Sequence, residues 1–455
     1  MPIQTKNPYN NQVLKTFKEF SDEVIEQKIH NSHQAFLKWK KSTFEQRAGV
    51  LFRIADILER RKLEYATLIT TEMGKLISQS ESEIDMCSRV FRYYAENGEK
   101  FLQDQSFDVP DGSAFVRYSP IGAIFAVMPW NYPFNQVARI AAPNIMAGNS
   151  MVVKHASNVP QCAQAIEDLF AEAGAPENLY TNLFVPGDKT SKLVANKYIA
   201  GASLTGSEDA GASLAAEAGA HIKKSVLELG GSDAFIVLDD ADIELAVEKA
   251  YAGRFGNMGQ ACTSSKRIIV LEKIADEFLK RFKDKISQLK VGDPMDRTTE
   301  IGPLSSESAV DKIQKQVDET VSQGAKILVG GKRIDREGAF FEFTILTDIK
   351  PGMTAYHEEI FGPVASYYVV KDDQEAIALA NDTTFGLGGS VFSRNIDRAI
   401  SVASQIDTGM VFINEPTASR PELPFGGTKR SGYGRELSPL GIEEFVNKKL
   451  IRIAP

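Results

Sequence analysis

The 455-residue sequence has few of the side chains that build disulfides and metal centres. It contains three cysteines and five histidines. Cys87, Cys162 and Cys262 are too scattered for a disulfide framework or a cysteine-based zinc site. The histidines lack the H-x-x-x-H and H-E-x-x-H spacings of zinc ligands. We therefore expect no metal site, and we expect a reducing, cytoplasmic compartment.

Long apolar runs and strong charge are also missing. No segment approaches the roughly 20 apolar residues that cross a bilayer, and the start, MPIQTKNPYNNQVL, lacks the basic-then-apolar order of a signal peptide. The net charge of −8, from 52 basic and 60 acidic residues, disfavours nucleic acid and membrane surfaces as partners. With 43% hydrophobic and 25% charged residues, the composition is typical of a folded protein of two or three domains.

Most of the sequence has a pattern typical of alternating strands and helices. Asp22 to about Leu102 has helical periodicity, as in QRAGVLFRIADILERR. After Pro120, short apolar runs such as IGAIFAVM, SMVVKHA and IAGASLTG alternate with helical segments, one of them predicted at TSKLVANKY. The alternation resumes after Cys262, with KRIIVL and ASYYVV. This pattern predicts parallel, doubly wound α/β sheets in two domains with a cleft between them.

Cys262 lies in the stretch FGNMGQACTSSKR, residues 255–267. A lone cysteine is most often a small buried hydrophobe, and this alternative stays open on the stretch alone. The glycine and amides before it suit close approach of the backbone to a ligand. The TSS that follows supplies backbone N–H groups that could hold an anion. Such surroundings are typical of a thiolate nucleophile.

Three other stretches are candidate site segments. Glu228, in LELGGSDAF, ends an apolar strand; it is either a surface or capping group or a general base whose pKa burial raises. Asn131, in PWNYPFNQVAR, follows a strand, where its amide could stabilise an oxyanion, although the motif alone indicates no more than a turn. SLTGSEDAG at 203–211 opens a helix whose N–H groups could take a phosphate. The G-x-G-x-x-G fingerprint is absent.

These four stretches, in this order, resemble the aldehyde dehydrogenase superfamily, as do EEIFGPV at 358–364 and PFGGTKRSGYGRE at 424–436. The resemblance spans the chain and is closest to the shorter members that oxidise succinate semialdehyde. It implies a Rossmann-like cofactor domain, an α/β catalytic domain and a small β oligomerisation arm. The expected boundaries are 1–102 and 122–228 for the cofactor domain, 229–436 for the catalytic domain, and 103–121 and 437–455 for the arm. Exposed strand edges in the arm imply a homodimer or a dimer of dimers.

The resemblance also implies roles for individual residues. Cys262 would attack the aldehyde carbon, and Asn131 with the Cys262 backbone N–H would hold the oxyanion. Hydride would pass to the nicotinamide, and Glu228 would activate the water that hydrolyses the thioester. The cofactor-binding residues would be Trp130, Lys154, Ser157, Gly206, Ser207, Glu359 and Phe361.

Two departures from the family pattern bear on specificity. Many NAD-dependent relatives carry a glutamate three residues after the lysine that matches Lys154, where this chain has Ser157. Because a serine does not repel a 2′-phosphate, we predict that NADP is preferred and NAD is used less well. Arg139 stands where semialdehyde-oxidising relatives bind the substrate carboxylate, with a surface or packing role as the alternative. Arg420 lies in the stretch that lines the substrate end in relatives.

Two more departures bear on proton transfer and redox control. Ile140 replaces a lysine that many relatives pair with a C-terminal glutamate, so Glu436 is expected to lack its usual partner and proton removal from Glu228 to depend on water. Ser264 replaces a second cysteine present in some relatives, which excludes that disulfide. Glutarate semialdehyde or an aliphatic aldehyde as substrate, a non-redox thiol esterase and a non-catalytic role are the alternatives. The intact site positions argue against the last two.

Overall fold

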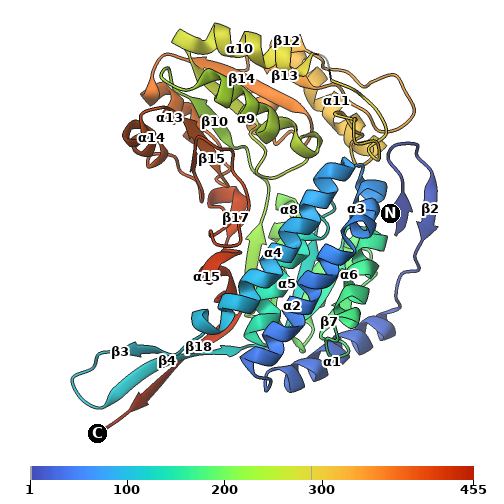
Figure 1. The fold of residues 1–455 in the computed structure, drawn as a ribbon, viewed down its shortest axis with the longest axis vertical. Helices are drawn as coiled ribbons and strands as arrows, with labels where there is room; N and C mark the ends of the chain where they lie inside the picture. The colour runs from blue at the N-terminus through green and yellow to red at the C-terminus, as the bar shows by residue number, and fades with distance from the viewer. Residues whose placement is uncertain (1–2, 288) are drawn as a thin grey trace.

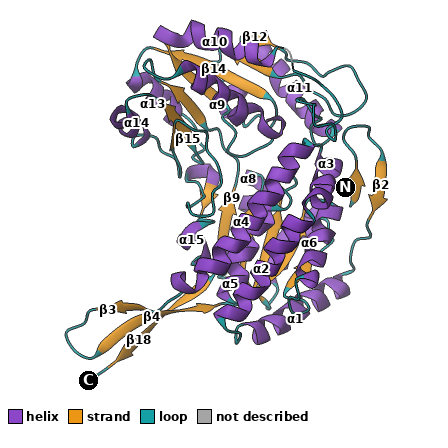
Figure 2. Ribbon diagram, viewed as in Figure 1, coloured by secondary structure: helices purple, strands orange, loops and turns teal. Residues whose placement is uncertain are grey.

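Two α/β lobes and a projecting β arm make up the chain (Figure 1). The structure is a computed structural model that describes residues 3–287 and 289–455, without the side chain of residue 188. The first lobe contains a six-stranded sheet and the second a seven-stranded sheet. Because these sheets are built mainly of parallel strands with helices packed on them (Figure 2), the predicted α/β fold class is confirmed.

Four helices precede the first sheet: α1 (Asp22–Trp39), α2 (Phe44–Arg60), α3 (Lys62–Met73) and α4 (Ile77–Phe101). Thr43 and Gln46 form a capping box at the start of α2. α3 ends at Gly74, whose φ of 80° forms a left-handed C-cap. This turn sends the chain into α4, where the backbone N–H of Ile77 donates to the carbonyl of Pro294 in the second lobe at 2.9 Å.

The first sheet has the strand order β17-β9-β8-β5-β6-β7. Its parallel strands are β5 (Ala123–Met128), β6 (Ser150–His155), β7 (Tyr180–Asn182), β8 (Ile199–Thr205) and β9 (Lys224–Glu228). The helices of this part are α5 (Asn135–Ala147), α6 (Pro160–Glu172) and α8 (Glu208–Ala220). The short strand β17 (Gly432–Tyr433) joins β9 antiparallel. Since the chain runs from β5 to β6 on one side and returns to β8 on the other, the strand order reverses here, where α/β folds bind ligands.

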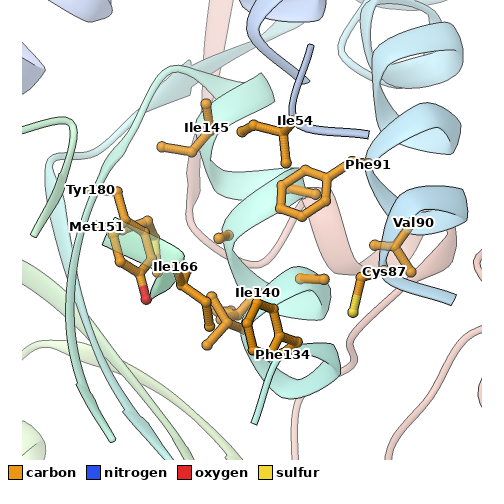
Figure 3. Close-up of a cluster of buried hydrophobic side chains, with 14 of the residues drawn as sticks. Ile54, Cys87, Val90, Phe91, Phe134, Ile140, Ile145, Met151, Ile166 and Tyr180 are labelled. Atoms are coloured by element: carbon orange, nitrogen blue, oxygen red, sulfur yellow. The ribbon is translucent and has the colours of Figure 1, made fainter. Parts of the chain in front are cut away.

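The hydrophobic core of this lobe lies between the helices and the sheet. Figure 3 shows Cys87, Val90 and Phe91 of α4 among core side chains of α2 and α5. Cys87 and Cys162 are 1% and 0% exposed, and burial raises the pKa of both thiols well above its usual range. These two cysteines are therefore inert core residues, whereas Cys262 is partly exposed.

The second sheet has the order β12-β13-β14-β11-β10-β15-β16. Its parallel strands are β10 (Ala234–Val237), β11 (Arg267–Leu271), β13 (Thr344–Thr347), β14 (Val364–Val370), β15 (Gly389–Phe392) and β16 (Phe412–Ile413), and β12 (Lys326–Val329) is an antiparallel edge. The helices are α9 (Ile243–Phe255), α10 (Glu272–Ile286), α11 (Glu307–Ser322), α12 (Thr354–His357), α13 (Asp373–Asn381) and α14 (Ile396–Ala403). None of the helices in the described part of the chain is long and apolar enough to cross a membrane.

Segments far apart in the sequence build the arm. β3 (Gln105–Phe107), β4 (Ser113–Pro120) and β18 (Val446–Ile453) form an antiparallel sheet that extends away from both lobes (Figure 1). α15 (Ser438–Ile442) precedes β18, and β1 (Gln4–Lys6) and β2 (Val13–Thr16) form an N-terminal hairpin.

The helix predicted at TSKLVANKY is shorter than expected. The structure has α7 (Gly187–Thr190) followed by a 3₁₀ helix, Ser191–Ala195. The Asn196 side chain accepts the backbone N–H of Tyr198 at 2.9 Å, and this local turn ends the helical segment.

Candidate active site

A cavity of about 380 Å³ lies beside Cys262, where the two lobes meet. Its walls come from α4, from α5 and the residues just before it, and from the segments 256–263 and 417–425. Arg139 is the one cationic side chain among the described residues that line it, and Glu83 is the one acidic side chain. The cavity is therefore mostly neutral, with one group that suits an anionic ligand.

The segment 256–263, called the nucleophile loop below, has an unusual backbone. Asn257 and Met258 have φ of 51° and 57°, a left-handed conformation that non-glycine residues rarely adopt. The Asn257 amide nitrogen Nδ2 donates to the carbonyls of Asn131 at 3.1 Å and Gln260 at 3.2 Å. These hydrogen bonds hold the strained turn just before Cys262.

Cys262 is partly exposed at the wall of the cavity, and its thiol lies near two cations. Burial raises its pKa to about 12, while the charges of Arg139 and Lys266 act in the opposite direction. The Lys266 ammonium donates to the carbonyls of Ala261 and Cys262, both at 2.9 Å. Burial thus favours the protonated thiol, and Arg139 and Lys266 are the groups that favour the thiolate.

Glu228, the last residue of β9, is a buried carboxylate with no hydrogen-bond partner among the residues that the structure describes. Its side chain is among the buried groups, and neither carboxylate oxygen accepts a hydrogen bond from the described residues. Burial raises its pKa well above the usual range, with a further contribution from Glu436, while Arg139 and Arg435 oppose the rise. A Cβ atom at Gly426 would lie 2.8 Å from Oε1, so a glycine is needed beside it. Both oxygens therefore remain available to a water molecule or a ligand.

Asn131 follows β5 in the segment 129–134, called the oxyanion loop below. Its amide nitrogen donates to the carbonyl of Gln260 at 3.0 Å, which links it to the nucleophile loop. An amide has two N–H donors, so the second remains for a ligand. The structure thus ties the predicted oxyanion donor to the loop that carries the predicted nucleophile.

Arg139 and Glu436 form a buried ion pair. Arg139 Nε donates to Glu436 Oε2 at 2.6 Å, and Nη2 lies 2.5 Å from the same oxygen. The guanidinium also lies 3.8 Å from the centroid of the Phe425 ring. Glu436 therefore lacks the lysine that many relatives place at position 140, as expected, but it pairs with a different cation, Arg139. Ile140 turns into the hydrophobic core, and the preceding residue, Arg139, supplies the cation instead.

The structure does not bring Arg420 to this cavity. Thr417, Ala418 and Ser419 line its wall, but the half-exposed Arg420 side chain pairs with Glu415 at 2.6 Å instead. Of the two arginines predicted to bind substrate, only Arg139 reaches the cavity.

The predicted cofactor residues of the first lobe gather at the carboxyl ends of its strands. Lys154, near the end of β6, is 8% exposed, has no hydrogen bond or ion pair among the described residues, and has its pKa lowered by burial. The partly buried Ser157 follows it. Ser207 caps α8 by accepting the N–H of Ala210 at 3.4 Å, and the N–H of Gly206 donates to the carbonyl of Glu228 at 3.0 Å. A free ammonium and a helix start fit the phosphates and ribose of a dinucleotide.

The remaining predicted cofactor residues lie where the lobes meet. The Glu359 carboxylate accepts the N–H of Gly231 at 3.1 Å and pairs with Lys266 at 3.0 Å. The rings of Trp130 and Phe361 meet edge to face, with centroids 5.7 Å apart. These contacts bring EEIFGPV next to the nucleophile and oxyanion loops.

Sequence reasoning missed Arg254, a fully buried cation in α9. It donates to Ser264 Oγ, to the carbonyl of Val364 at 2.7 Å and to the carbonyls of Ile360 and Gly362. Burial lowers its pKa to about 9. The arginine thereby ties EEIFGPV to the residues that follow Cys262. No signal in the sequence distinguishes it from a surface arginine.

Comparisons with known proteins agree with this geometry. The aldehyde dehydrogenase family profile matches residues 1–451. The chain is 47% identical to succinate-semialdehyde dehydrogenase (NADP+) of Deinococcus radiodurans, covering 100% of this chain and 95% of that protein. It is 46% identical to the probable succinate-semialdehyde dehydrogenase (NADP+) of Synechocystis sp., with 100% of both covered. The crystal structure of succinic semialdehyde dehydrogenase from Streptococcus pyogenes in complex with NADP+ has 44% identity and a TM-score of 0.98, with 100% of both chains covered. The chain belongs to the aldehyde dehydrogenase family.

Proposed function

We propose that the protein oxidises succinate semialdehyde to succinate with NADP, through a covalent intermediate on Cys262. The observation that carries this proposal is the cavity in which Cys262 and Arg139 line the same walls. Arg139 Nη1 has no partner among the described residues, since Glu436 faces Nε and Nη2. A carboxylate bound there leaves the other end of a short aldehyde to reach the thiol. The relatives from Deinococcus radiodurans and Synechocystis carry the same activity in their names.

The chemistry follows from the groups around Cys262. The thiol releases its proton to solvent water, Arg139 and Lys266 stabilise the resulting thiolate, and Sγ attacks the aldehyde carbon. The resulting oxyanion accepts hydrogen bonds from the Asn131 amide and the Cys262 backbone N–H. NADP, held by the cofactor residues described below, would supply the nicotinamide that accepts the hydride of that carbon, which would convert the adduct into a thioester. Glu228 then accepts a proton from the water that attacks the thioester carbonyl, the C–S bond breaks, and succinate and the thiolate separate.

The cofactor residues support a preference for NADP over NAD. Lys154 supplies a buried ammonium that pairs with none of the residues the structure describes, and Ser157 supplies a hydroxyl without negative charge. Together they suit a 2′-phosphate on the adenosine ribose. Gly206 and Ser207 would hold the pyrophosphate, and Glu359 the nicotinamide ribose. Trp130 would lie near the pyrophosphate and Phe361 against the nicotinamide end.

A panel of aldehydes assayed with both cofactors tests the proposal. We expect NADPH formation with the highest kcat/KM for succinate semialdehyde, and none by Cys262→Ala. A kcat/KM for butanal equal to that for succinate semialdehyde would contradict carboxylate recognition. A higher kcat/KM for glutarate semialdehyde would identify that aldehyde as the preferred substrate instead. A higher kcat/KM with NAD would contradict the role of Ser157. Thioester or ester hydrolysis without any NADPH would favour the thiol esterase.

The arm supports a second proposal, on assembly. We propose that β18 meets other copies of this chain, in a dimer or a dimer of dimers. Leu450 and Ile453 on this edge strand are 64% and 53% exposed, and an exposed apolar strand edge favours pairing with another chain. Light scattering should give a dimer or tetramer mass, and Leu450→Lys should shift it towards the monomer. A monomeric wild type would contradict the proposal.

A further inference from the structure

A buried glutamate on α4 caps the start of another helix. Glu83 Oε1 accepts the N–H of Phe134 at 2.9 Å and of Asn135 at 3.1 Å. These N–H groups belong to the beginning of α5, which has no side-chain cap of its own and would otherwise leave its first donors unpaired. Glu83 therefore fixes the end of the oxyanion loop, which carries Asn131.

Lys75 holds this glutamate in place. Its ammonium bonds to Glu83 Oε2, and both side chains are 0% exposed. The same ammonium lies 3.5 Å from the centroid of the Tyr132 ring, a cation–π contact. Tyr132 is the neighbour of Asn131 and lines the cavity. The Lys75–Glu83 pair thus holds the oxyanion loop at two points.

The same face of α4 also holds the nucleophile loop. Gln79 lies one helical turn before Glu83, so the two side chains share a face. Gln79 Oε1 accepts the backbone N–H of Asn257 at 3.1 Å. Asn257 in turn donates to the carbonyl of Asn131. One helix face therefore contacts both loops, and the loops are bonded to each other.

We propose that Glu83, fixed by Lys75, is a positioning residue that sets the Asn131 amide against the thiol of Cys262. The inference rests on the proposed function, in which Asn131 binds the oxyanion. A displacement of about 1 Å in a reactive geometry can cost on the order of 100-fold in rate. Without the two hydrogen bonds to Glu83, the loop gains this freedom, while the cofactor residues at the strand ends keep their places.

A matched pair of double variants isolates the hydrogen bonds. Lys75→Met/Glu83→Gln and Lys75→Met/Glu83→Leu both remove the two charges, so neither leaves a buried charge unpaired and both present a neutral group to the cavity. Only the glutamine keeps an oxygen that can accept the Phe134 and Asn135 N–H groups. We expect kcat to be roughly tenfold or more lower in the leucine variant, with the Kd for NADP the same within about twofold. Equal kcat values would overturn the proposal.

The same comparison in an Asn131→Ala background separates positioning from general loss of structure. If Glu83 acts through Asn131, the glutamine-to-leucine difference shrinks to less than about twofold. A tenfold difference in both backgrounds would overturn the proposal. Asn131→Ala itself should lower kcat roughly 100-fold, and if it does not, the proposed oxyanion role fails independently of Glu83.

Two controls keep the test decisive. kcat is expressed per Cys262 thiol titrated in folded protein, so partial unfolding does not imitate a loss of positioning. If the leucine variant does not fold, Glu83→Asp keeps the charge but shortens the reach, and it should show the same loss and the same dependence on Asn131. Glu81→Gln, on the same helix, removes a surface pair with Arg297 and should stay within about twofold of wild type.

Discussion

The α3–α4 junction and the ends of strands β6 and β9 bury charge in opposite ways. At the junction, Lys75 and Glu83 are fully buried and bond to each other, to backbone N–H groups and to an aromatic ring. At the strand ends, Lys154 and Glu228 are nearly as buried, yet neither has a hydrogen bond or ion pair among the described residues. An unpaired buried charge destabilises a fold unless a ligand or water compensates it. We therefore propose that the junction serves stability and alignment and that the strand ends are kept for ligands and chemistry.

The largest effect should come from Glu228→Gln. We expect kcat to fall by roughly 10²- to 10⁴-fold, because the group proposed to activate water as a general base is lost. The thermal midpoint should stay the same or rise, because an unpartnered carboxylate is replaced by a neutral amide. Steady-state kinetics and thermal unfolding measure the two effects. A large fall in the midpoint would mean that Glu228 has a structural partner. The contrast between the α3–α4 junction and the strand ends would then fail.

The pH dependence of stability sharpens this prediction. The folded protein holds the pKa of Glu228 above its usual 4.5, so the folded state binds the proton more tightly than the unfolded state. The contribution is stabilising at low pH and is lost as pH rises through the folded-state pKa. Denaturant titrations should therefore show Glu228→Gln gaining stability relative to wild type as pH increases from about 4.5. A constant difference across pH would contradict the raised pKa.

At the junction, Lys75→Met should act mainly on stability. It leaves Glu83 buried without its counterion, which should cost about 3–5 kcal/mol in free energy of unfolding. Urea denaturation measures this loss, and Lys75→Met/Glu83→Gln should recover most of it, because the buried charge is then gone as well. If Lys75→Met is as stable as wild type, the junction is not the supporting element described above.

Lys154→Met should show the reverse pattern. We expect the KM for NADP to rise roughly tenfold or more, since the charge-assisted bond proposed between Lys154 and the cofactor is lost. The free energy of unfolding of the free protein should remain unchanged or increase. Cofactor titrations and urea denaturation provide both numbers. A loss of stability similar to that of Lys75→Met would show that the two regions do not differ.

The smallest effect should come from Arg420→Ala. Its surface pair with Glu415 is worth little, and its side chain does not line the cavity. We expect kcat/KM for succinate semialdehyde to change by less than about twofold, whereas Arg139→Met should raise KM by roughly tenfold or more. Equal losses for the two variants would place Arg420 in substrate binding after all.

Sequence reasoning reached the parallel α/β fold because strand and helix periodicities are local. The resemblance to the family added the roles proposed for Cys262, Glu228 and Asn131. Ion pairs between buried residues far apart in the sequence could not be predicted. Arg139 and Glu436 are 297 positions apart, and the sequence indicated only that Ile140 could not pair with the glutamate.

The Lys75–Glu83 pair could not be predicted from the sequence for a related reason. A lysine just after α3 and a glutamate early in α4 are ordinary surface residues by their pattern. They are buried in the tertiary structure, where they contact each other, the Tyr132 ring and the start of α5. The role of Arg254 is likewise evident only from the structure, in which α9 packs against EEIFGPV and Arg254 donates to its carbonyls.

The most direct test of the central claim is a single-turnover experiment on Glu228→Gln with succinate semialdehyde and NADP, followed by intact mass and NADPH absorbance. We predict a burst of one NADPH per active site, and a succinyl group that remains on Cys262 because the thioester is not hydrolysed. Cys262→Ala should show neither the burst nor the added mass. Continued turnover at the wild-type rate by Glu228→Gln, or a burst of NADPH without a succinyl adduct on Cys262, would contradict the account.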